Sequence, residues 1–466
     1  MAGSAVASKL KRPRSVTPST LLGWLQLAGS AVFLSHHSVA AWLTVLLGRL
    51  RGKHPLSHPD WPLDLALISA GFRVCMEKGC MVDFRPLLSG LSLLQFYPGL
   101  RLQRVNAGGC KAYWMRLRGG REVQHAQVVL FYVHGGAFVG GDACMTAWTF
   151  QHWMQRLAGS GLHAVVLSVE YPLAPERRFP AAVVDTAAAY TWLRQQLQQQ
   201  GSSACIIPVA DSAGANILVA ALTALRDISS GSSMDELLQG AVAQTAAAEQ
   251  SNDQHSSAEA AAEVQDAVAE LFTSLKDRLC QINGSSSSSS NALSRASSSS
   301  SSNTGSSGLN VSSSLATALS SSGSTTVPDM TAQIGASAEI TRAAGSSGAA
   351  AAAAAAAAFV PPAAMVLVSP AMDISEQACF YDEEWRAQHE PRFDYLPVSV
   401  VGGGMHHYVG STALLACGYV SPLHAASLAG LAGGPWLVLA GGAELMARDI
   451  DRCGNVYSVH AGLQML

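Results

Sequence analysis

The sequence predicts an α/β fold in which a mainly parallel sheet is flanked by helices. Short runs rich in β-branched residues, such as QVVLFYV, alternate along the chain with stretches of helical periodicity. Such runs are typical of strands buried on both faces, and strands that alternate with helices usually pair in parallel. The expected strands cover residues 127–133, 163–169, 205–209, 364–369 and 436–440, and the expected helices cover 61–82, 146–158, 185–199 and 214–226.

Length and charge limit the classes of protein to consider. The chain has 466 residues, enough for two or three domains or for one large domain with additions. Its 29 basic and 32 acidic residues give a formal net charge of −3, whereas nucleic-acid-binding proteins carry a clear positive excess. No nucleic-acid partner is therefore expected.

The N-terminal segment, residues 1–59, differs from the rest. It contains seven basic residues and no acidic residue, and its apolar stretch over residues 21–47 is long enough to span a bilayer. His36 and His37 lie in the middle of that stretch, where polar groups are costly. Three interpretations stay open: a membrane anchor, an organelle transit segment and an ordinary buried helix. We expect a membrane-associated protein, for instance at the endoplasmic reticulum, with an organelle-targeted or a cytoplasmic protein as alternatives.

A long insert divides the predicted domain into residues 60–228 and residues 361–466. The insert, residues 229–360, contains two runs of six serines and ten consecutive alanines, and so few large apolar side chains predict a mostly disordered segment. Residues 258–280 are an exception, because their apolar residues fall on one helical face. We interpret them as a transient helix, with a partner-binding helix as the alternative.

The nine cysteines indicate neither a disulfide scaffold nor a metal site. Their number is odd, no C-x-x-C pair occurs, and no cysteine–histidine spacing suits zinc. Buried free thiols are expected, with a bridge between Cys75 and Cys80 as the alternative. No metal and no organic cofactor are expected.

Two loops at strand ends carry residue types that nucleophilic catalysis uses. Strand 127–133 runs into HGGAF (residues 134–138), where a glycine pair lets backbone N–H groups face a space suited to an anion. Strand 205–209 runs into ADSAG (residues 210–214) and then a helix. A serine at such a sharp turn presents its hydroxyl at the carboxyl edge of the sheet. The alternative is an ordinary helix start with Ser212 as the N-cap.

Further motifs complete a family resemblance. The chain contains YPLAPE at residues 171–176, SPAMD at 369–373 and SPL at 421–423. In this order and spacing, the motifs resemble those of the hormone-sensitive-lipase-like branch of the α/β hydrolases, which includes arylacetamide-deacetylase-like enzymes and plant carboxylesterases. The resemblance covers residues 100–228 and 361–450.

The resemblance implies an α/β-hydrolase fold and a set of catalytic residues. Ser212 would be the acylating nucleophile, and Gly135, Gly136 and Ala213 would supply the N–H groups of the oxyanion hole. The acid would be Glu444, which follows strand 436–440 where the family usually has Asp. Asp449 is the alternative acid. Four other polar residues would orient loops rather than react, and they are His134, Glu176, Asp185 and Asp211.

The general base departs from the family pattern. The family places its histidine beyond one more helix and strand, but only 22 residues follow Glu444. The sole histidine among them is His460, in a segment that lacks the apolar periodicity of a closing strand, while His406 and His407 precede the acid. We expect a C-terminus that is incomplete relative to a functional protein. The alternatives are His460 as the base and a chain that has no base.

These observations lead to one expected function and its alternatives. The chain is expected to be a serine carboxylesterase or deacetylase that hydrolyses a small hydrophobic ester through an acyl-enzyme on Ser212. The expected partner is thus a small-molecule ester, held under a lid formed by the N-terminal helices and residues 374–420. The first alternative is a non-catalytic small-molecule-binding protein, like the gibberellin-receptor-like relatives that have lost the histidine. The second is a chain that folds poorly because its last strand and helix are missing.

Overall fold

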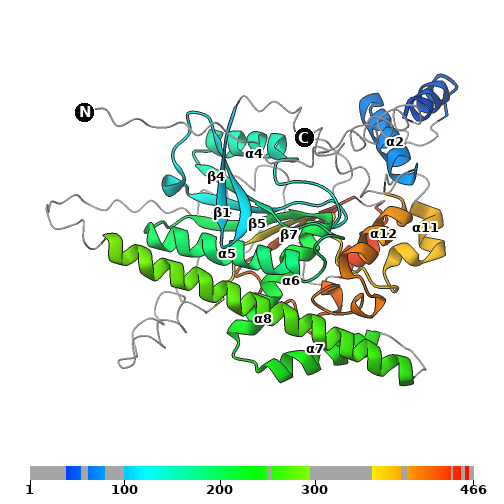
Figure 1. Ribbon diagram of the computed structural model, residues 1–466. Coiled ribbons are helices and arrows are strands. Elements are labelled where there is room, and N and C mark those ends of the chain that lie inside the picture. Colours follow the sequence, from blue (N-terminus) through cyan, green and yellow to red (C-terminus); the bar gives the residue numbers. More distant parts are fainter. Residues whose placement is uncertain are drawn as a thin grey trace, which may run out of the picture.

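An eight-stranded sheet forms the centre of the protein, seen in a computed structural model that describes residues 38–53, 61–78, 99–248, 254–293, 359–389, 396–441, 444–452 and 457–460 (Figure 1). The strand order is β1-β2-β4-β3-β5-β6-β7-β8. All pairs from β4 to β8 are parallel, and only β1–β2 and β2–β4 are antiparallel. The strands are β1 (Leu100–Ala107), β2 (Cys110–Leu117), β3 (Val128–Val133), β4 (Ala164–Glu170), β5 (Cys205–Asp211), β6 (Met365–Val368), β7 (Trp436–Ala440) and β8 (Tyr457–His460). The predicted α/β fold is confirmed.

Helices cover both faces of this sheet. On β3, Val129 and Phe131 belong to the core cluster that includes α5 and α6, whereas Leu130 and Tyr132 belong to the cluster under α4. This alternation explains why the strand is apolar throughout its length. The longer helices are α2 (Leu63–Lys78), α4 (Ala147–Gly159), α5 (Ala181–Gln199), α6 (Ser212–Ser229), α7 (Met234–Ala248), α8 (Gln254–Leu293) and α12 (Val398–Val409), and the shorter ones are α11 (Glu383–His389) and α13 (Ala447–Asp451).

The five predicted strands are confirmed to within about two residues, but the antiparallel hairpin of β1 and β2 was not predicted. Its two-residue turn uses Gly108 and Gly109, whose φ angles are 63° and 92°. Such positive angles at both positions suit the tight turns that connect antiparallel strands. The side chain of Asn106 accepts a hydrogen bond from the Gly109 N–H at 2.7 Å.

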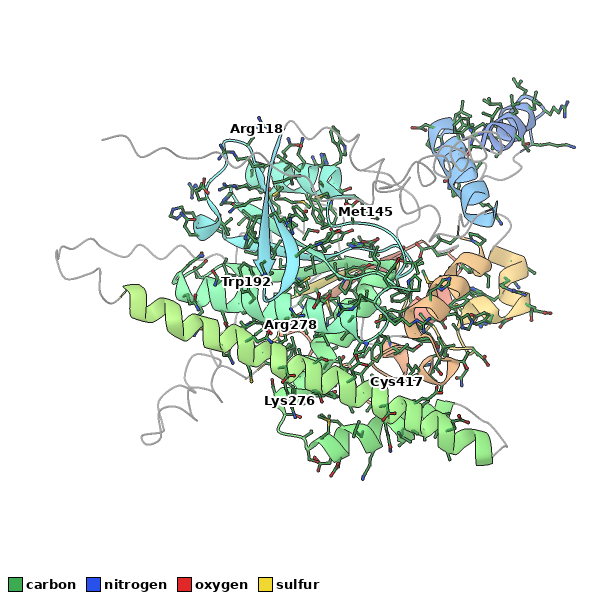
Figure 2. All side chains as sticks on the ribbon, in the orientation of Figure 1. Arg118, Met145, Trp192, Lys276, Arg278 and Cys417 are labelled. Carbon is green, nitrogen blue, oxygen red and sulfur yellow. The ribbon has the colours of Figure 1, made fainter. Side chains whose placement is uncertain are left out.

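The first half of the insert forms two packed helices, whereas its composition predicts a mostly disordered segment with one transient helix. Helices α7 and α8 pack onto the domain, and α8 lies along α5 (Figures 1 and 2). Arg278 of α8 forms an ion pair with Asp185 of α5 at 2.9 Å. The apolar face of α8 is fully buried in the main core cluster, and its residues are Val264, Val268, Leu271, Phe272 and Leu275. The interpretation of a mostly disordered insert is therefore wrong for its helices, because this face contributes to the domain core. Residues 294–358, with their serine and alanine runs, lie outside the described residues.

The C-terminal segment also differs from its prediction. A five-residue helix, α13, follows β7, and the chain then forms β8, which pairs in parallel with β7. The expectation that this segment contains no closing strand is wrong. Four residues are enough for an edge strand, because it needs backbone partners on one side only.

The N-terminal predictions are tested only in part. The helix over residues 38–50 coincides with the end of the apolar stretch, whereas residues 21–37 lie outside the described residues. Within the described part of the chain, no helix combines the length and apolarity needed to cross a membrane. Localisation stays a prediction. The six described cysteines are free thiols, but the expected burial holds only for Cys110, Cys144, Cys379 and Cys417, since Cys205 is half-buried and Cys280 is exposed. The side chains of Cys75 and Cys80 lie outside the described set.

Candidate active site

Ser212 stands at a strained turn between β5 and α6. Its φ angle is 49°, in the left-handed region that non-glycine residues rarely occupy, at a typical cost of about 1–3 kcal/mol. Asp211, not Ser212, is the N-cap of α6, so the alternative of a capping serine is wrong. A Cβ at Gly214 would lie 2.3 Å from the carbonyl oxygens of Val133 and His134. The turn is therefore pressed against the end of β3 and requires a glycine there.

The HGGAF loop lies against this turn. A Cβ at Gly135 would lie 3.1 Å from the Cβ of Ser212. The φ angles of Gly136, Ala137 and Phe138 are 127°, 50° and 65°, so three successive residues adopt left-handed backbone. Backbone turned in this way points successive N–H groups toward a common space, as in anion-binding nests.

The two loop N–H groups without an acceptor differ from the predicted pair, Gly135 and Gly136. The Gly135 N–H donates to Asp211 Oδ1 at 3.1 Å, because the carboxylate that precedes Ser212 turns into the loop. Because the Gly135 N–H already donates to Asp211, it differs from the free oxyanion-hole donor that the sequence predicts. Among the described residues, the N–H groups of Gly136 and Ala137 have no acceptor within hydrogen-bond distance. Ala213, in the first turn of α6, has one of the N–H groups that lack an intrahelical acceptor. Sequence reasoning missed Ala137, and the consecutive left-handed residues are what reveal it.

Asp211 fastens the turn and the loop to each other. Its Oδ1 atom also accepts a hydrogen bond from the Tyr132 hydroxyl at 2.5 Å. Burial raises the pKa of Asp211 above its ordinary value, although the hydrogen bond from Tyr132 acts in the opposite direction. The predicted orienting role of Asp211 agrees with these contacts.

The YPLAPE segment forms hydrogen bonds with the HGGAF loop. The Tyr171 hydroxyl donates to the carbonyl oxygen of His134 at 2.7 Å, and the two rings stack at 4.2 Å. The Ala174 N–H donates to the carbonyl oxygen of Phe138 at 3.0 Å. His134 is 1% exposed, which agrees with an orienting role.

Helix α12 forms a cover above the loop. A Cβ at Gly404 would lie 2.4 Å from the carbonyl oxygen of Ala137, so this helix contacts the loop directly. Tyr408 stacks on Phe138 with 4.1 Å between ring centroids and 12° between planes. The predicted lid over residues 374–420 thus includes a helix that contacts the loop. His406 and His407 lie on this helix, and His406 is exposed.

Glu444 is held at the carboxyl edge of the sheet by two hydrogen bonds. Its Oε1 atom accepts from the Ser369 hydroxyl at 2.6 Å and from the Gly441 N–H at 2.7 Å. Ser369 follows β6 with a φ angle of 44°, a second strained serine at a strand end. Sequence reasoning recognised Ser369 only as part of a motif and missed this contact.

The alternative acid, Asp449, is hydrogen-bonded and ion-paired to residues outside the candidate site. It is 2% exposed within α13, where it accepts a hydrogen bond from the Cys379 N–H at 2.7 Å and pairs with Arg452 at 3.2 Å. Burial raises the pKa of Asp449 above its ordinary value. Glu444 is therefore the better placed of the two carboxylates.

The three predicted catalytic residues and Ser369 lie at the ends of four adjacent strands. Ser212 follows β5, Ser369 follows β6, Glu444 follows β7, and His460 ends β8. In the register of the sheet, His460 lies opposite Ala440, the last residue of β7. Three strand spacings of about 4.8 Å separate β5 from β8 by about 14 Å. A hydrogen bond between Ser212 and His460 therefore requires the end of β8 to approach β5, and the role of His460 stays a prediction.

A further histidine, His424, directly follows the SPL motif, and its ring is already hydrogen-bonded. The Nε2 atom of His424 lies 3.1 Å from Asp373 Oδ1 and 3.1 Å from the Ser375 hydroxyl. Asp373 is 1% exposed. Burial raises its pKa, but the hydrogen bond and charge of His424 and the hydrogen bonds from Ser375 together outweigh that effect, and the net pKa lies below the ordinary value. This contact joins the SPAMD motif to the residue that follows the SPL motif.

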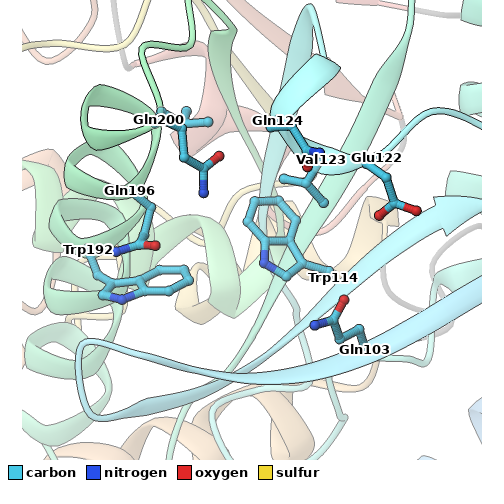
Figure 3. A pocket seen from close by; sticks show the side chains of 9 residues that line it. Gln103, Trp114, Glu122, Val123, Gln124, Trp192, Gln196 and Gln200 are labelled. Carbon is cyan, nitrogen blue, oxygen red and sulfur yellow. The ribbon is translucent and has the colours of Figure 1, made fainter. Parts of the chain in front are cut away.

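Two cavities lie away from Ser212. One, of about 260 Å³, is lined by Trp114 of β2, Trp192 of α5 and several glutamines (Figure 3). The other, of about 530 Å³, lies between the YPLAPE region and α8, with Arg177, Arg178 and Arg278 among its lining residues. Neither is lined by a residue of the turn or the HGGAF loop.

Parts of the chain are similar to known proteins. Residues 130–291 match a family model described as "alpha/beta hydrolase fold". An "Acetyl-hydrolase" of Streptomyces hygroscopicus is 38% identical over 125 residues, which are 26% of this chain and 37% of that protein. "Esterase LipI" of Mycobacterium tuberculosis is 38% identical over 175 residues, 36% of this chain and 52% of that protein. The chain thus spans about half or less of the length of these relatives. A crystal structure of an esterase from the bacterial hormone-sensitive lipase family has a TM-score of 0.45 and 20% identity, covering 83% of this chain and 82% of that one.

Proposed function

Because the chain belongs to the α/β hydrolase fold-3 family, we propose that it is a serine carboxylesterase that hydrolyses small hydrophobic esters through an acyl-enzyme on Ser212. The observation that carries the proposal is the strained turn at Ser212, pressed against a loop of left-handed residues. Backbone strain of this kind clusters at active sites. The similarity to an esterase and to an acetyl-hydrolase supports the same reaction class.

In the proposed reaction, the Ser212 hydroxyl oxygen attacks the ester carbonyl carbon. The N–H groups of Gly136, Ala137 and Ala213 donate to the oxygen on which negative charge develops, and each such donor typically contributes about 100- to 1000-fold in rate. The alcohol leaves with a proton, and water then cleaves the acyl-enzyme to release the acid.

The proton transfers require a general base that Glu444 can orient. We assign this role to His460, because it ends the strand next to the one that precedes Glu444. A carboxylate in this position holds the imidazole in the correct tautomer and stabilises its protonated form. In this scheme Glu444 acts on the histidine, and Ser369 acts on Glu444.

The experiment compares the full chain with Ser212→Ala on nitrophenyl acetate and nitrophenyl butyrate. We expect Ser212→Ala to lower kcat at least about 1000-fold. Ser160→Ala, at an exposed serine that follows α4, is the matched control and should keep full activity. A fluorophosphonate probe should label the wild type at Ser212, as mass spectrometry of the peptides would show. Equal rates above background for the wild type and Ser212→Ala would refute the proposal.

His460→Asn tests the base separately. We expect a loss of kcat similar to that of Ser212→Ala, because members of a catalytic triad act as a unit. An unchanged kcat in His460→Asn, with Ser212→Ala inactive, would refute the assignment of the base and leave the nucleophile in place.

A further inference from the structure

The helix over residues 38–50 carries an apolar face directed away from the protein. Nine large apolar side chains are exposed in the described part of the chain, and seven of them belong to this helix and α2. Their exposed fractions on the helix range from 37% at Leu46 to 83% at Leu50. The residues of this outward face are Val39, Trp42, Leu43, Leu46, Leu47 and Leu50.

The opposite face of the same helix is already buried against α2. Ala41 and Val45 are buried against Ala66 and Ala70 of α2. The outward residues recur at intervals of three and four, which is the spacing of one helical face. This helix therefore has two apolar faces, and packing on α2 covers the one with the smaller side chains together with one edge of Trp42.

One residue of the outward face, Trp42, is hydrogen-bonded to α2. The Trp42 indole N–H donates to the carbonyl oxygen of Leu67 in α2 at 2.8 Å. Gly71 of α2 leaves room for the ring, since a Cβ there would lie 2.8 Å from the indole nitrogen. With its single polar group satisfied, the ring contributes an apolar edge to the face.

Positive charge flanks the apolar face. Arg49, Arg51 and Lys53 lie at and just beyond the end of the helix, and Arg51 and Lys53 are exposed. The first acidic residue of the chain is Asp60. An apolar helical face that contains a tryptophan and is flanked by basic residues is the pattern of helices that lie in the surface of anionic membranes.

The face also lies on the side of the lid. Helix α2 contacts α12, which covers the HGGAF loop (Figure 1). We propose that the outward face of helix 38–50 binds the surface of membranes containing anionic lipids, with the lid side of the domain turned toward the bilayer. The 13 residues of this helix that the structure describes extend about 20 Å.

A lipid surface fits the face better than a second copy of the chain does. Another copy would bring a second group of basic residues, without acidic partners from the same segment, against the first. The described part of this face, on residues 38–50, is also small beside the roughly 800 Å² per partner of a standard protein interface. Anionic lipid headgroups supply the negative charge that the basic residues need. The leucines can be buried among the acyl chains, which require no shape complementarity.

The test measures how the full chain partitions onto vesicles of phosphatidylcholine alone and of phosphatidylcholine with 30% phosphatidylglycerol. We expect clear preference for the anionic vesicles, weakened by salt. Leu43→Glu/Leu47→Glu should lower the partition coefficient at least about tenfold. Arg51→Gln/Lys53→Gln should lower it about 30-fold on anionic vesicles only. Trp148→Ser, at a tryptophan of α4 that is 62% exposed, is the matched control and should bind like the wild type.

Three results would overturn the proposal. The first is wild-type binding that is absent, or that Leu43→Glu/Leu47→Glu leaves unchanged. The second is protein that resists alkaline carbonate extraction and is insensitive to salt, which indicates a spanning anchor. The third is a dimer that Leu43→Glu/Leu47→Glu converts to a monomer with no effect on vesicle binding, which indicates a second copy on the face. Because all these positions are exposed, unchanged circular dichroism and Tm would show that the variants fold.

Discussion

Replacing Phe272 by alanine should destabilise the whole domain, although Phe272 lies in an insert of low complexity. The side chain is fully buried, and its ring meets that of Tyr419 edge to face, with 5.4 Å between centroids and 87° between planes. Tyr419 belongs to the part of the domain that follows the insert. The contact therefore joins the insert to the C-terminal half of the fold.

The expected cost follows from burial. Truncating a buried phenylalanine to alanine typically costs about 3–5 kcal/mol, since transfer free energy and a cavity both contribute. A domain of about 300 residues has an unfolding entropy of about 0.6 kcal/mol/K, so the loss lowers Tm by about 5–8 °C. The same change in a solvated helix would alter stability by less than about 0.5 kcal/mol.

The assay is thermal and urea unfolding of the full chain, followed by near-ultraviolet and far-ultraviolet circular dichroism. Thr273→Ala is the matched control, because Thr273 is the exposed neighbour of Phe272 on the same helix. We expect Thr273→Ala to leave Tm within about 1 °C of the wild type. If both variants unfold at the wild-type temperature, α8 does not contribute to the core, and the reasoning from its buried face is refuted.

Three further predictions concern the site and its supports. Ser369→Ala should lower kcat/KM for nitrophenyl butyrate about tenfold at unchanged Tm, because Glu444 loses one of its two hydrogen bonds; unchanged kinetics would contradict this positioning role. Asp373→Asn should lower the free energy of unfolding at pH 7. Since the folded pKa of Asp373 is lowered, the stability that its charge contributes is present above the unfolded value of 3.8 and is lost as the pH falls through the folded pKa. The deficit of Asp373→Asn in urea unfolding should therefore shrink below pH 4, and a deficit that grows there would contradict the contact with His424. Gly214→Ala should abolish esterase activity and lower stability by about 1–3 kcal/mol, because its Cβ would lie 2.3 Å from two backbone carbonyl oxygens; an active, stable variant would show that the turn is less tightly pressed against β3.

The central strands and the turn at Ser212 were predictable because their signals are local. Buried parallel strands are apolar on both faces, so β3, β4 and β5 stand out as continuous runs. A sharp turn between a strand and a helix needs small residues on either side of the serine. Ala210 and Gly214 are such residues, and they indicate the turn at Ser212. Such patterns involve residues within a few positions of one another.

The insert was misjudged because composition averages over a segment. Its serine and alanine runs dominate the average, whereas the buried face of α8 depends on a few residues spaced three or four apart. An amphipathic pattern indicates that a helix has one apolar face, but it does not indicate what covers that face. Here α5, α7 and the segment from Thr412 to Tyr419 pack against α8.

The candidate site shows the same division between local and distant information. The order of motifs along the chain was enough to predict the fold class and to select Ser212 and Glu444 as candidate site residues, since each lies next to a strand with a strong local pattern. Which N–H groups are available, which serine holds Glu444 and where β8 pairs all depend on contacts between residues distant in sequence. Gly135 is engaged by Asp211 from 76 positions away, and Glu444 is held by Ser369 from 75 positions away. A hydrogen bond across such a separation exists only once the strands have paired, so no local pattern records it.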